Sequence, residues 1–241
     1  MKVSIVIPAY NEEKLIGETL CAIRAALAVF ARLGWESELI VCDNNSTDRT
    51  GEMARAFGAT VVFEPVNQIA RSRNCGAAAA TGDWLIFVDA DSRPTPELFA
   101  DVAEQIRGGR CLAGGCTIRL DQKALAAEII LCGWNLVSRT LKWAAGSFIF
   151  CETAAFREIG GFSHELFVSE ELDLSIRLKR LARRQGRRMV ILHRHPLLTS
   201  ARKMHLYSPA EHAWFMFKTI CTRGRTLRSR EKCDIWYDGR R

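Results

Sequence analysis

The first hundred residues alternate short apolar runs with helical patterns, and this order constrains the fold more than any other feature. Strand-length apolar runs cover residues 3–7, 38–42, 60–63 and 84–88. Between them, helical patterns cover residues 12–32, a short stretch ending at Phe57, and residues 69–80. Consecutive strands joined by helices run parallel, because each helix carries the chain back to the edge where the previous strand began. We therefore predict an α/β fold with a mainly parallel central sheet flanked by helices.

Two aspartates stand where the fourth run leaves the predicted sheet, in the sequence Asp89-Ala90-Asp91. Residues i and i+2 of an extended chain point the same way, so these carboxylates converge. Converging carboxylates repel each other unless a cation lies between them, and their oxygens favour Mg²⁺ or Mn²⁺. An isolated D-x-D is more often a solvated acidic turn, so its context decides the interpretation.

Two other strand ends supply that context. The first run, which we expect Pro8 to end, continues as Pro8-Ala9-Tyr10-Asn11-Glu12, and the second run ends at Asp43. The carboxyl ends of parallel strands share one edge of a sheet, and ligands of open α/β sheets bind there. The sequence thus predicts one polar site at this edge.

The second half of the chain has a looser pattern. We expect helices at residues 96–107, 123–142, 170–184 and 209–221, and strands at residues 112–118, 148–151 and 189–192. The last stretch, 223–241, is basic and weakly apolar, and fits either a tail or a clamp.

Composition is that of a soluble globular protein, with 48% hydrophobic and 25% charged residues in 241. No apolar run reaches the roughly 18 residues of a membrane span, and the N-terminus does not resemble a signal peptide.

The net charge is +7, yet residues 1–100 hold 9 Lys and Arg against 13 Asp and Glu, so the cations gather in the remainder. The sequence shows no nucleic-acid module, so we expect no nucleic acid partner; phosphate on a small donor or an anionic membrane fits better.

Nine cysteines, an odd number without a C-x-x-C pair, argue against a disulfide framework and a zinc site. Cys42, Cys75, Cys116, Cys132 and Cys151 have apolar or small neighbours, so we expect them to be reduced and buried. This cysteine usage predicts a cytosolic protein.

Four motifs together resemble the family 2 glycosyltransferases, inverting enzymes of the GT-A fold that use nucleotide-sugar donors. The motifs are Pro8 to Glu12; Asp43 with Ser46-Thr47-Asp48; Arg71 to Gly76 before the D-x-D; and Gly160-Gly161-Phe162 with Glu170-Glu171-Leu172-Asp173. Their order and approximate spacing match over residues 1–205. The resemblance implies a single domain, 1–222, with a nucleotide-sugar-binding half (1–95), an acceptor-binding half (96–222) and a basic tail (223–241).

The resemblance implies that the donor binds at the strand ends. Asp43 matches the position that holds the base and ribose, where a carboxylate accepts bonds from N–H or hydroxyl groups. Pro8, Tyr10 and Glu12 match the residues around the base, and Ala90 belongs to the donor-binding D-x-D segment.

The resemblance also implies a divalent metal, Mg²⁺ or Mn²⁺, on the diphosphate. Asp91 matches the direct ligand, while Asp89 bonds the ribose or supports the metal through water. Such a metal neutralises charge on the departing nucleoside diphosphate. His195 is a further candidate ligand, although a lone histidine is more often structural.

Cations are expected to meet the phosphates. Arg71 and Arg73 precede the D-x-D and could face the donor, although one of them could pair only with a structural aspartate. Arg202 and Lys203 resemble the basic segment that closes over the diphosphate in many relatives, and an arginine can grip phosphate with two hydrogen bonds. The Gln-x-x-Arg-Trp motif of processive synthases is absent from the sequence, which favours non-processive transfer.

Inverting transfer needs a base that removes the proton of the acceptor hydroxyl. The resemblance assigns this role to Glu171, where the family usually has aspartate; Glu170 is the alternative, and Asp173 is the more structural choice. A helix N-terminus favours an ionised carboxylate, so we expect a base that is ready near neutral pH.

Three other classes of protein share single features of this sequence. A nucleotidylyltransferase needs a glycine-rich basic loop after the first strand, whereas this loop reads Pro-Ala-Tyr-Asn-Glu-Glu. A dehalogenase-type phosphatase carries D-x-D on its first strand, whereas here the pair follows the fourth. A nucleotide-sugar-binding or nucleic-acid-binding protein without transferase activity remains the alternative. For the enzyme, the basic second half suggests an acceptor that is lipid-linked, with Trp134, Trp143, Trp214 and Phe215 as either interfacial anchors or core residues.

Overall fold

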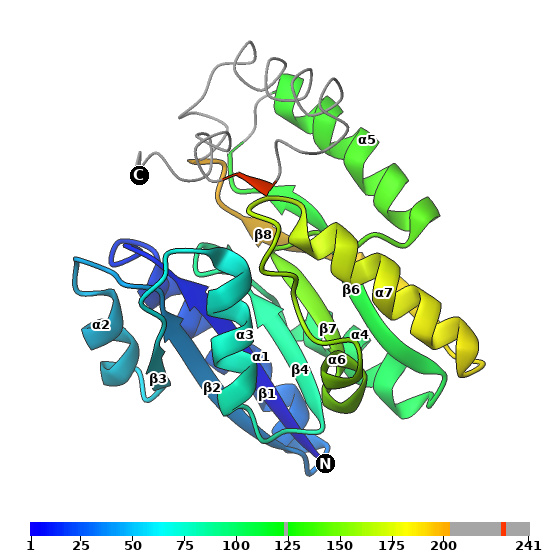
Figure 1. Cartoon of the computed structure of the whole chain (residues 1–241), viewed down its shortest axis with the longest axis horizontal. Coiled ribbons are helices and arrows are strands. Elements are labelled where there is room, and N and C mark those ends of the chain that lie inside the picture. The colour runs from blue at the N-terminus through cyan, green and yellow to red at the C-terminus, as the bar shows by residue number, and fades with distance from the viewer. Residues whose placement is uncertain (123–124, 203–227, 230–241) are drawn as a thin grey trace.

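The computed structural model describes residues 1–122, 125–202 and 228–229, in which one sheet lies between two layers of helices (Figure 1). In chain order the elements are β1 (Lys2–Ala9), α1 (Ile16–Arg32), β2 (Glu36–Asp43), α2 (Thr50–Ala56), β3 (Thr60–Phe63), α3 (Ile69–Ala79), β4 (Trp84–Val88), β5 (Ser92–Arg93), α4 (Pro96–Arg107), β6 (Cys111–Leu120), α5 (Leu125–Leu141), β7 (Phe148–Glu152), α6 (Thr153–Glu158), α7 (Glu170–Arg184) and β8 (Arg188–Thr199).

The described strands form one eight-stranded sheet in the order β3-β2-β1-β4-β7-β6-β8-β5. The first four pair in parallel, as do β6 and β8. β7 runs antiparallel to both β4 and β6. The predicted α/β fold with a mainly parallel sheet is therefore confirmed. The antiparallel β7 was not predicted, because a short run buried on both faces carries no signal of strand direction.

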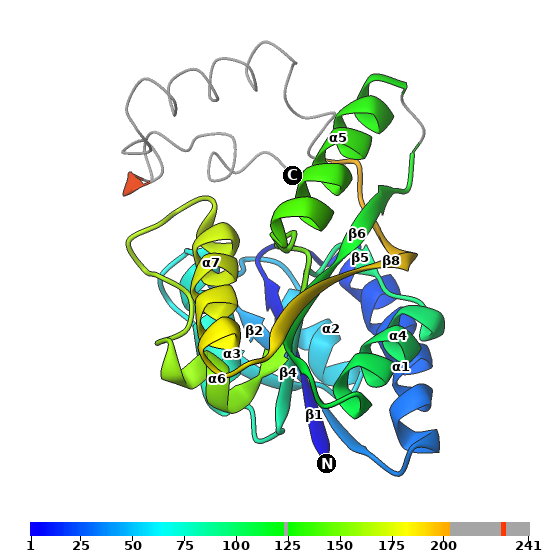
Figure 2. The same cartoon turned by 90° about the vertical axis from the view of Figure 1, so that its right-hand side faces the viewer.

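Helices cover the two faces of the sheet (Figure 2). Each face has its own core of aromatic and aliphatic side chains. On the face of α1 and α4, Phe30 stacks on Phe99 with 5.2 Å between ring centroids. On the face of α3, α6 and α7, Phe87 meets Phe162 edge-on at 5.1 Å. The second core reaches from β4 to the loop before α7, so it fixes the distance between the two elements that carry the acidic motifs.

The loop after β1 is held by the loop after β2. Asn11 and Glu12 donate their backbone N–H groups to Ser46 Oγ (3.0 Å) and Thr50 Oγ1 (2.8 Å). These bonds keep the start of the predicted helix as a loop, so α1 begins at Ile16 rather than Glu12. β1 also continues through Pro8, because its pairing with β4 has ended at Val6 and a missing N–H on that side costs nothing.

β8 is much longer than its predicted span of 189–192. The polar residues and proline at 193–196 obscured its continuation, which coincides with a shift of register against β6. Its end pairs antiparallel with β5, so that Thr199 lies opposite Ser92. This pairing brings residues 200–202 beside the D-x-D, over a hundred positions earlier in the chain.

Other differences concern single segments. Cys132 is exposed on α5, contrary to the expectation of burial, and Cys75 is only half-buried, whereas Cys42, Cys116 and Cys151 are buried. The predicted helix at 209–221 and the boundary between domain and tail at 222 lie outside the described residues. No helix in the described part of the chain is both long and apolar enough to span a bilayer.

Gly114 on β6 provides a test of this packing. A Cβ there would overlap the Phe150 ring and lie 2.7 Å from the Val190 carbonyl oxygen, so Gly114→Ala is expected to lower the free energy of unfolding by about 2 kcal/mol or more. The matched control is Gly133→Ala on α5, where a Cβ meets nothing within 4 Å, and helix propensity predicts a gain of about 0.5–1 kcal/mol. Urea denaturation measures both; equal stability of the Gly114 variant and the parent would contradict the packing.

Candidate active site

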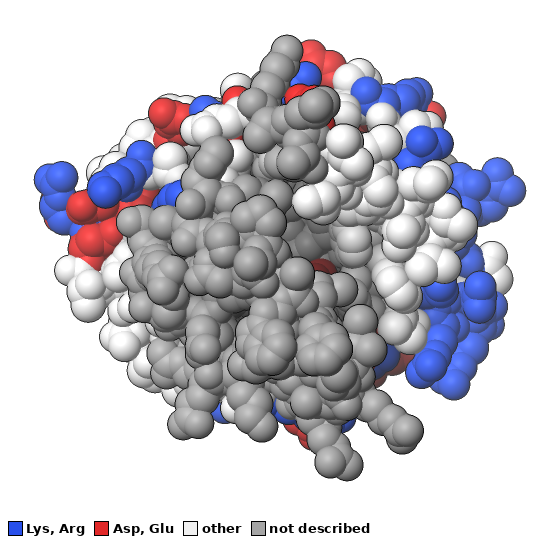
Figure 3. Space-filling model, turned by 90° about the horizontal axis from the view of Figure 1, so that it is seen from above, with Lys and Arg blue, Asp and Glu red and all other residues white. Residues whose placement is uncertain are grey.

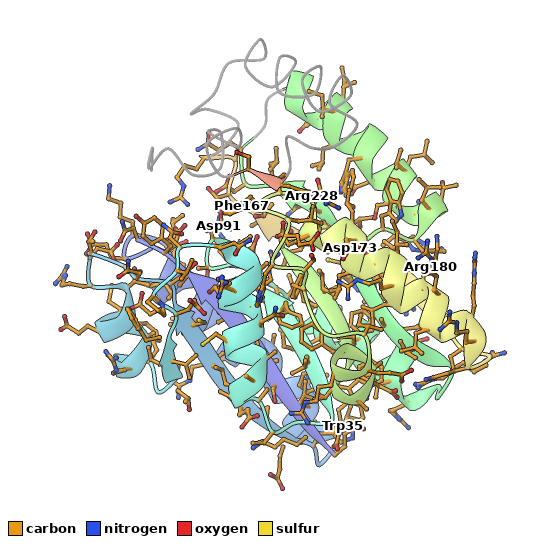
Figure 4. The ribbon with its side chains drawn as sticks, in the orientation of Figure 1. Trp35, Asp91, Phe167, Asp173, Arg180 and Arg228 are labelled. Carbon is orange, nitrogen blue, oxygen red and sulfur yellow. The ribbon has the colours of Figure 1, made fainter. Side chains whose placement is uncertain are left out.

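The expected strand ends meet at one edge of the sheet. Asp43 ends β2, and Asp89 and Asp91 follow β4, which is separated from β2 only by β1. Asp43 Oδ1 accepts the N–H of Ser46 at 2.9 Å, which fixes the carboxylate at the mouth of the loop. Figure 4 shows Asp91 at this edge, and Phe167 in the loop before α7 toward the same end of the molecule. The sequence therefore placed these carboxylates on the correct edge.

Arg73 on α3 joins the two acidic motifs. Its Nη2 lies 3.0 Å from Asp89 Oδ1, and its Nη1 lies 2.6 Å from Glu170 Oε1 at the start of α7. Nη2 also donates to the carbonyl oxygen of Gly146 (2.9 Å), and the guanidinium lies 5.2 Å from the centre of the Phe162 ring. The side chain is only 2% exposed, so one buried cation sets the position of the D-x-D relative to α7.

Three carboxylates of the described chain face the cation of Arg73, and the pKa values of Arg73 and of the two glutamates among them are shifted. Burial opposes its ionisation, but Asp89 and the two glutamates outweigh this and raise the pKa of Arg73. Burial raises the pKa of Glu170, against the opposing effect of Arg73. A buried arginine cannot give up its proton, so it remains the fixed charge of the cluster.

Glu171 lies beside this cluster, half-buried at the first turn of α7. A Cβ added to Gly146 would lie 3.6 Å from Glu171 Cγ and 3.1 Å from Arg73 Nη2. Burial, and then the neighbouring charge of Glu170, raise the pKa of Glu171 from 4.5 to about 8. Burial and like charge thus oppose the helix dipole, which we expected to keep this carboxylate ionised near neutral pH.

Arg202 reaches the D-x-D from the end of β8. Its Nη2 lies 2.7 Å from Glu12 Oε1 and 3.9 Å from Asp91 Oδ2. The bond with Glu12 raises the pKa of Arg202, although burial opposes this. Glu12 is 7% exposed and holds Arg202 at the carboxylates, while its role beside the nucleotide base stays a prediction. The structure thus brings Arg202 to the site as predicted, whereas Lys203 lies outside the described residues.

His195 is not brought to this edge. Its Nδ1 lies 3.0 Å from Asp101 Oδ2 on α4, four positions before the end of β8. The side chain therefore pairs with the buried carboxylate of Asp101 on the α4 side of the sheet, and its predicted role as a metal ligand is not supported. Within the described residues no group of three His, Cys, Asp or Glu side chains could hold a metal by itself.

The remaining predicted donor residues have different surroundings. Pro8 and Ala90 are buried at the strand ends, and the Ala90 carbonyl oxygen accepts a hydrogen bond from Thr19 Oγ1 at 2.8 Å. Tyr10 and Arg71 are half-buried at the rim, after β1 and in the first turn of α3. Their donor-binding roles stay predictions.

Residues 4–144 match the family model described as glycosyl transferase family 2, and these residues contain the ends of β1, β2 and β4 at the site. The chain belongs to glycosyl transferase family 2.

Two curated relatives indicate the range of this family. The family 2 chain is 33% identical over 123 residues to a dolichol-phosphate mannosyltransferase of Pyrococcus furiosus, covering 48% of this chain and 33% of that protein. It is 30% identical over 168 residues to an undecaprenyl-phosphate 4-deoxy-4-formamido-L-arabinose transferase of Klebsiella pneumoniae, covering 65% and 49%. The match thus spans between a third and a half of these two relatives' length.

Solved structures share the GT-A fold of the family 2 chain. TarS of S. aureus in complex with UDP-GlcNAc superposes with a TM-score of 0.65 at 19% identity, covering 99% of this chain and 71% of that one. Glucosyl-3-phosphoglycerate synthase of Mycobacterium tuberculosis, in complex with Mn²⁺, UDP and glucosyl-3-phosphoglycerate, gives 0.62 at 20% identity, covering 91% and 77%. At such identities the likeness establishes the fold alone.

Sequence reasoning missed two parts of the site in the family 2 chain. It left open which arginine of α3 is structural, and it overlooked the segment after α5 that carries Gly146. A lone arginine on the inner stripe of an alanine-rich helix was an available signal for Arg73, since a buried cation must have partners. Nothing in the sequence around Gly146 marks its contact with Arg73, which depends on the antiparallel β7 that follows.

The raised pKa of Glu171 predicts a stability effect that depends on pH. A carboxyl group whose pKa rises from 4.5 to about 8 on folding costs stability as pH increases across that interval. Glu171→Gln removes this cost, so in metal-free buffer its gain in unfolding free energy should grow from pH 5 to pH 9 by at least about 1 kcal/mol. Denaturant titrations at the two pH values measure it, with Glu165→Gln in the preceding loop as the exposed control; an equal gain at both pH values would contradict the electrostatic account.

Proposed function

We propose that this family 2 chain is a metal-dependent, inverting glycosyltransferase that moves one sugar at a time from a nucleoside-diphosphate sugar to an acceptor hydroxyl. The observation that carries the proposal is the shared ion pair of Arg73 with Asp89 and Glu170. It joins the D-x-D to the first turn of α7, so that the donor carboxylates and Glu171 belong to one site. The division into a donor half, 1–95, and an acceptor half, 96–222, is part of the same proposal.

The carboxylates at the end of β4 fit a divalent cation that is shared with the donor. Asp91 and Asp89 supply oxygen donors of the kind that Mg²⁺ and Mn²⁺ prefer, and such ions take their remaining ligands from phosphate and water. When bound, the cation neutralises charge that develops on the leaving nucleoside diphosphate. This arrangement agrees with a site in which the described chain offers fewer than three clustered protein ligands.

The chain's own residues bind and orient the donor. Asp43 accepts hydrogen bonds from the base or ribose, with Tyr10 at the rim. Arg202, held by Glu12 near Asp91, meets the diphosphate with a fork of N–H donors. Asp89 is held by Arg73 and is the supporting partner of Asp91.

Glu171 is the proposed general base. Its carboxylate accepts the proton of the acceptor hydroxyl while that oxygen bonds to the anomeric carbon, and the bond to the diphosphate oxygen breaks on the opposite side. Attack from the face opposite the leaving group inverts the anomeric centre. Glu170 is less suited to this role, because its carboxylate is only 5% exposed and engaged by Arg73.

For the substrates we propose a UDP-linked or related nucleotide sugar as donor and a lipid-linked acceptor. The names of two relatives contain dolichol phosphate and undecaprenyl phosphate, and structural neighbours were crystallised with UDP-GlcNAc or with UDP. We place the reaction in the cytosol at the membrane surface, which is also what the cysteine usage and the basic second half predict.

Asp91→Asn is expected to abolish the stabilisation that Mn²⁺ and UDP together give the parent protein. A ligand at a hundredfold its Kd stabilises by about 2.7 kcal/mol, which a thermal shift assay detects readily. Asp173→Asn on α7 is the matched control, since that carboxylate pairs with Arg177 and should leave the shift intact. An unchanged shift in the Asp91 variant would remove this residue from the metal site.

Glu171→Gln is expected to keep the affinity for Mn²⁺ and donor but to lose transfer by about a hundredfold or more, because only proton removal is lost. Single-turnover assays with radiolabelled donor measure the transfer, and calorimetry measures the binding. Near-normal turnover in this variant would show that the base is another residue.

Screening UDP-, GDP- and dTDP-sugars for Mn²⁺-dependent thermal stabilisation identifies the donor. If Mn²⁺ changes the affinity for none of these nucleotides, the proposal fails and a binding protein without transferase activity becomes the better interpretation.

A further inference from the structure

α5 exposes large apolar side chains on its outer side, although its inner side holds Leu131 and Trp134 as well as polar groups. Its inner side is anchored by polar groups: Asn135 accepts the N–H of Ile118 (3.1 Å) and donates to the carbonyl of the same residue (3.0 Å). Ser138, one turn further, is buried and donates to the Trp143 carbonyl oxygen at 2.6 Å. A helix of a globular protein normally turns its apolar stripe inward, so further apolar side chains exposed on the outer side of α5 mark a surface for a partner.

The outer side of α5 is apolar and exposed. At 100° per residue the half-buried and buried residues 131, 134, 135 and 138 fall on one side, and the exposed ones fall opposite. The large side chains of that outer side are Ile129 (66% exposed), Ile130 (65%), Leu136 (66%), Val137 (40%) and Leu141 (40%). Trp134, expected as an anchor, lies on the inner side, while Trp214 and Phe215 lie outside the described residues.

Basic residues border this apolar surface. Lys179 on α7 donates its Nζ to the Leu141 carbonyl oxygen at 2.9 Å, so α7 lies directly beside the end of α5. The exposed cations of this region are Arg139, Lys142, Arg180, Arg183 and Arg184. Figure 3 shows Lys and Arg side chains beside a surface without charge, and Figure 4 shows Arg180 projecting from α7. Apolar side chains bordered by cations are complementary to a bilayer with anionic headgroups.

A short segment connects α5 to the active site. After Trp143, the backbone N–H of Ala144 is held by Ser175 Oγ of α7 at 3.1 Å. Two residues later the carbonyl of Gly146 accepts Arg73 Nη2, beside Glu171. The segment that follows α5 therefore lies against Glu171, so α5 is joined to the proposed base by a few residues of chain.

We propose that α5 and the adjacent cations of α7 form a docking surface for an anionic lipid bilayer, in which α5 lies in the plane of the interface. The helix has 17 residues and does not qualify as a membrane span. The inference rests on the proposed function in one respect: docking brings a lipid-linked hydroxyl to Glu171 without its leaving the membrane.

The test is sedimentation of the full chain with phosphatidylcholine vesicles that contain or lack 30% phosphatidylglycerol. Binding to the anionic vesicles is expected, weakened by salt. The triple variant Ile129→Asp, Ile130→Asp, Leu136→Asp should bind at least about tenfold more weakly, because three apolar contacts are lost. Phe63→Asp is the control. Phe63 is another exposed apolar residue (58%), but it lies on β3 at the edge of the sheet rather than on α5, so this variant should bind vesicles as the parent does.

The outcomes separate this inference from the proposed function. The triple variant should keep the Mn²⁺–nucleotide thermal shift and its transfer to a water-soluble short-chain acceptor, while transfer to acceptor in vesicles falls. Equal vesicle binding by the triple variant and the parent overturns the docking surface, as does a parent that binds no anionic vesicle. Light scattering that shows a dimer in the parent and a monomer in the triple variant also overturns it, in favour of a second copy on α5.

Discussion

The position of the D-x-D relative to the start of α7 depends on the buried guanidinium of Arg73. It bonds Asp89 after β4, Glu170 at the start of α7 and the backbone before β7, and it lies against the Phe162 ring. Breaking a buried ion pair on one side leaves an uncompensated charge, at a cost of about 3–5 kcal/mol. The helix that carries Glu171 is thus held to the sheet edge by charge as well as by apolar packing.

The same concentration of charge has a cost in stability and a use in catalysis. One arginine faces Asp89, Glu170 and Glu171, so the neighbouring carboxylates are not all neutralised within the described chain. The raised pKa of Glu171 reflects this imbalance. Groups with shifted pKa values collect at active sites because the chemistry needs them, and the free energy comes from the rest of the fold. In this fold, packing in the two aromatic cores offsets the destabilisation of the charged cluster.

Much of the fold could be predicted from the sequence, because the signals of these helices and strands are local. The limits of β3, β4, α4 and α7 agree with the periodicity to the residue, and Asp43 and Asp91 lie on the expected edge. The features that local signals do not reveal involve distant partners: the length of β8 depends on β6 and β5, the contact of Glu12 depends on Arg202, and the place of His195 depends on Asp101. Pairings between residues a hundred positions apart leave no mark on either segment alone.

The central claim is that the metal–diphosphate site at Asp91 and the base at Glu171 are one active centre. A crystal structure with Mn²⁺ and a nucleoside diphosphate, with data collected at the manganese absorption edge, tests it most directly. The account predicts an anomalous peak within bonding distance of an Asp91 oxygen and of the diphosphate, with Arg202 on the phosphates and Glu171 facing the open side of the β-phosphate. A peak elsewhere in the protein, or Glu171 turned away from the diphosphate, would contradict it.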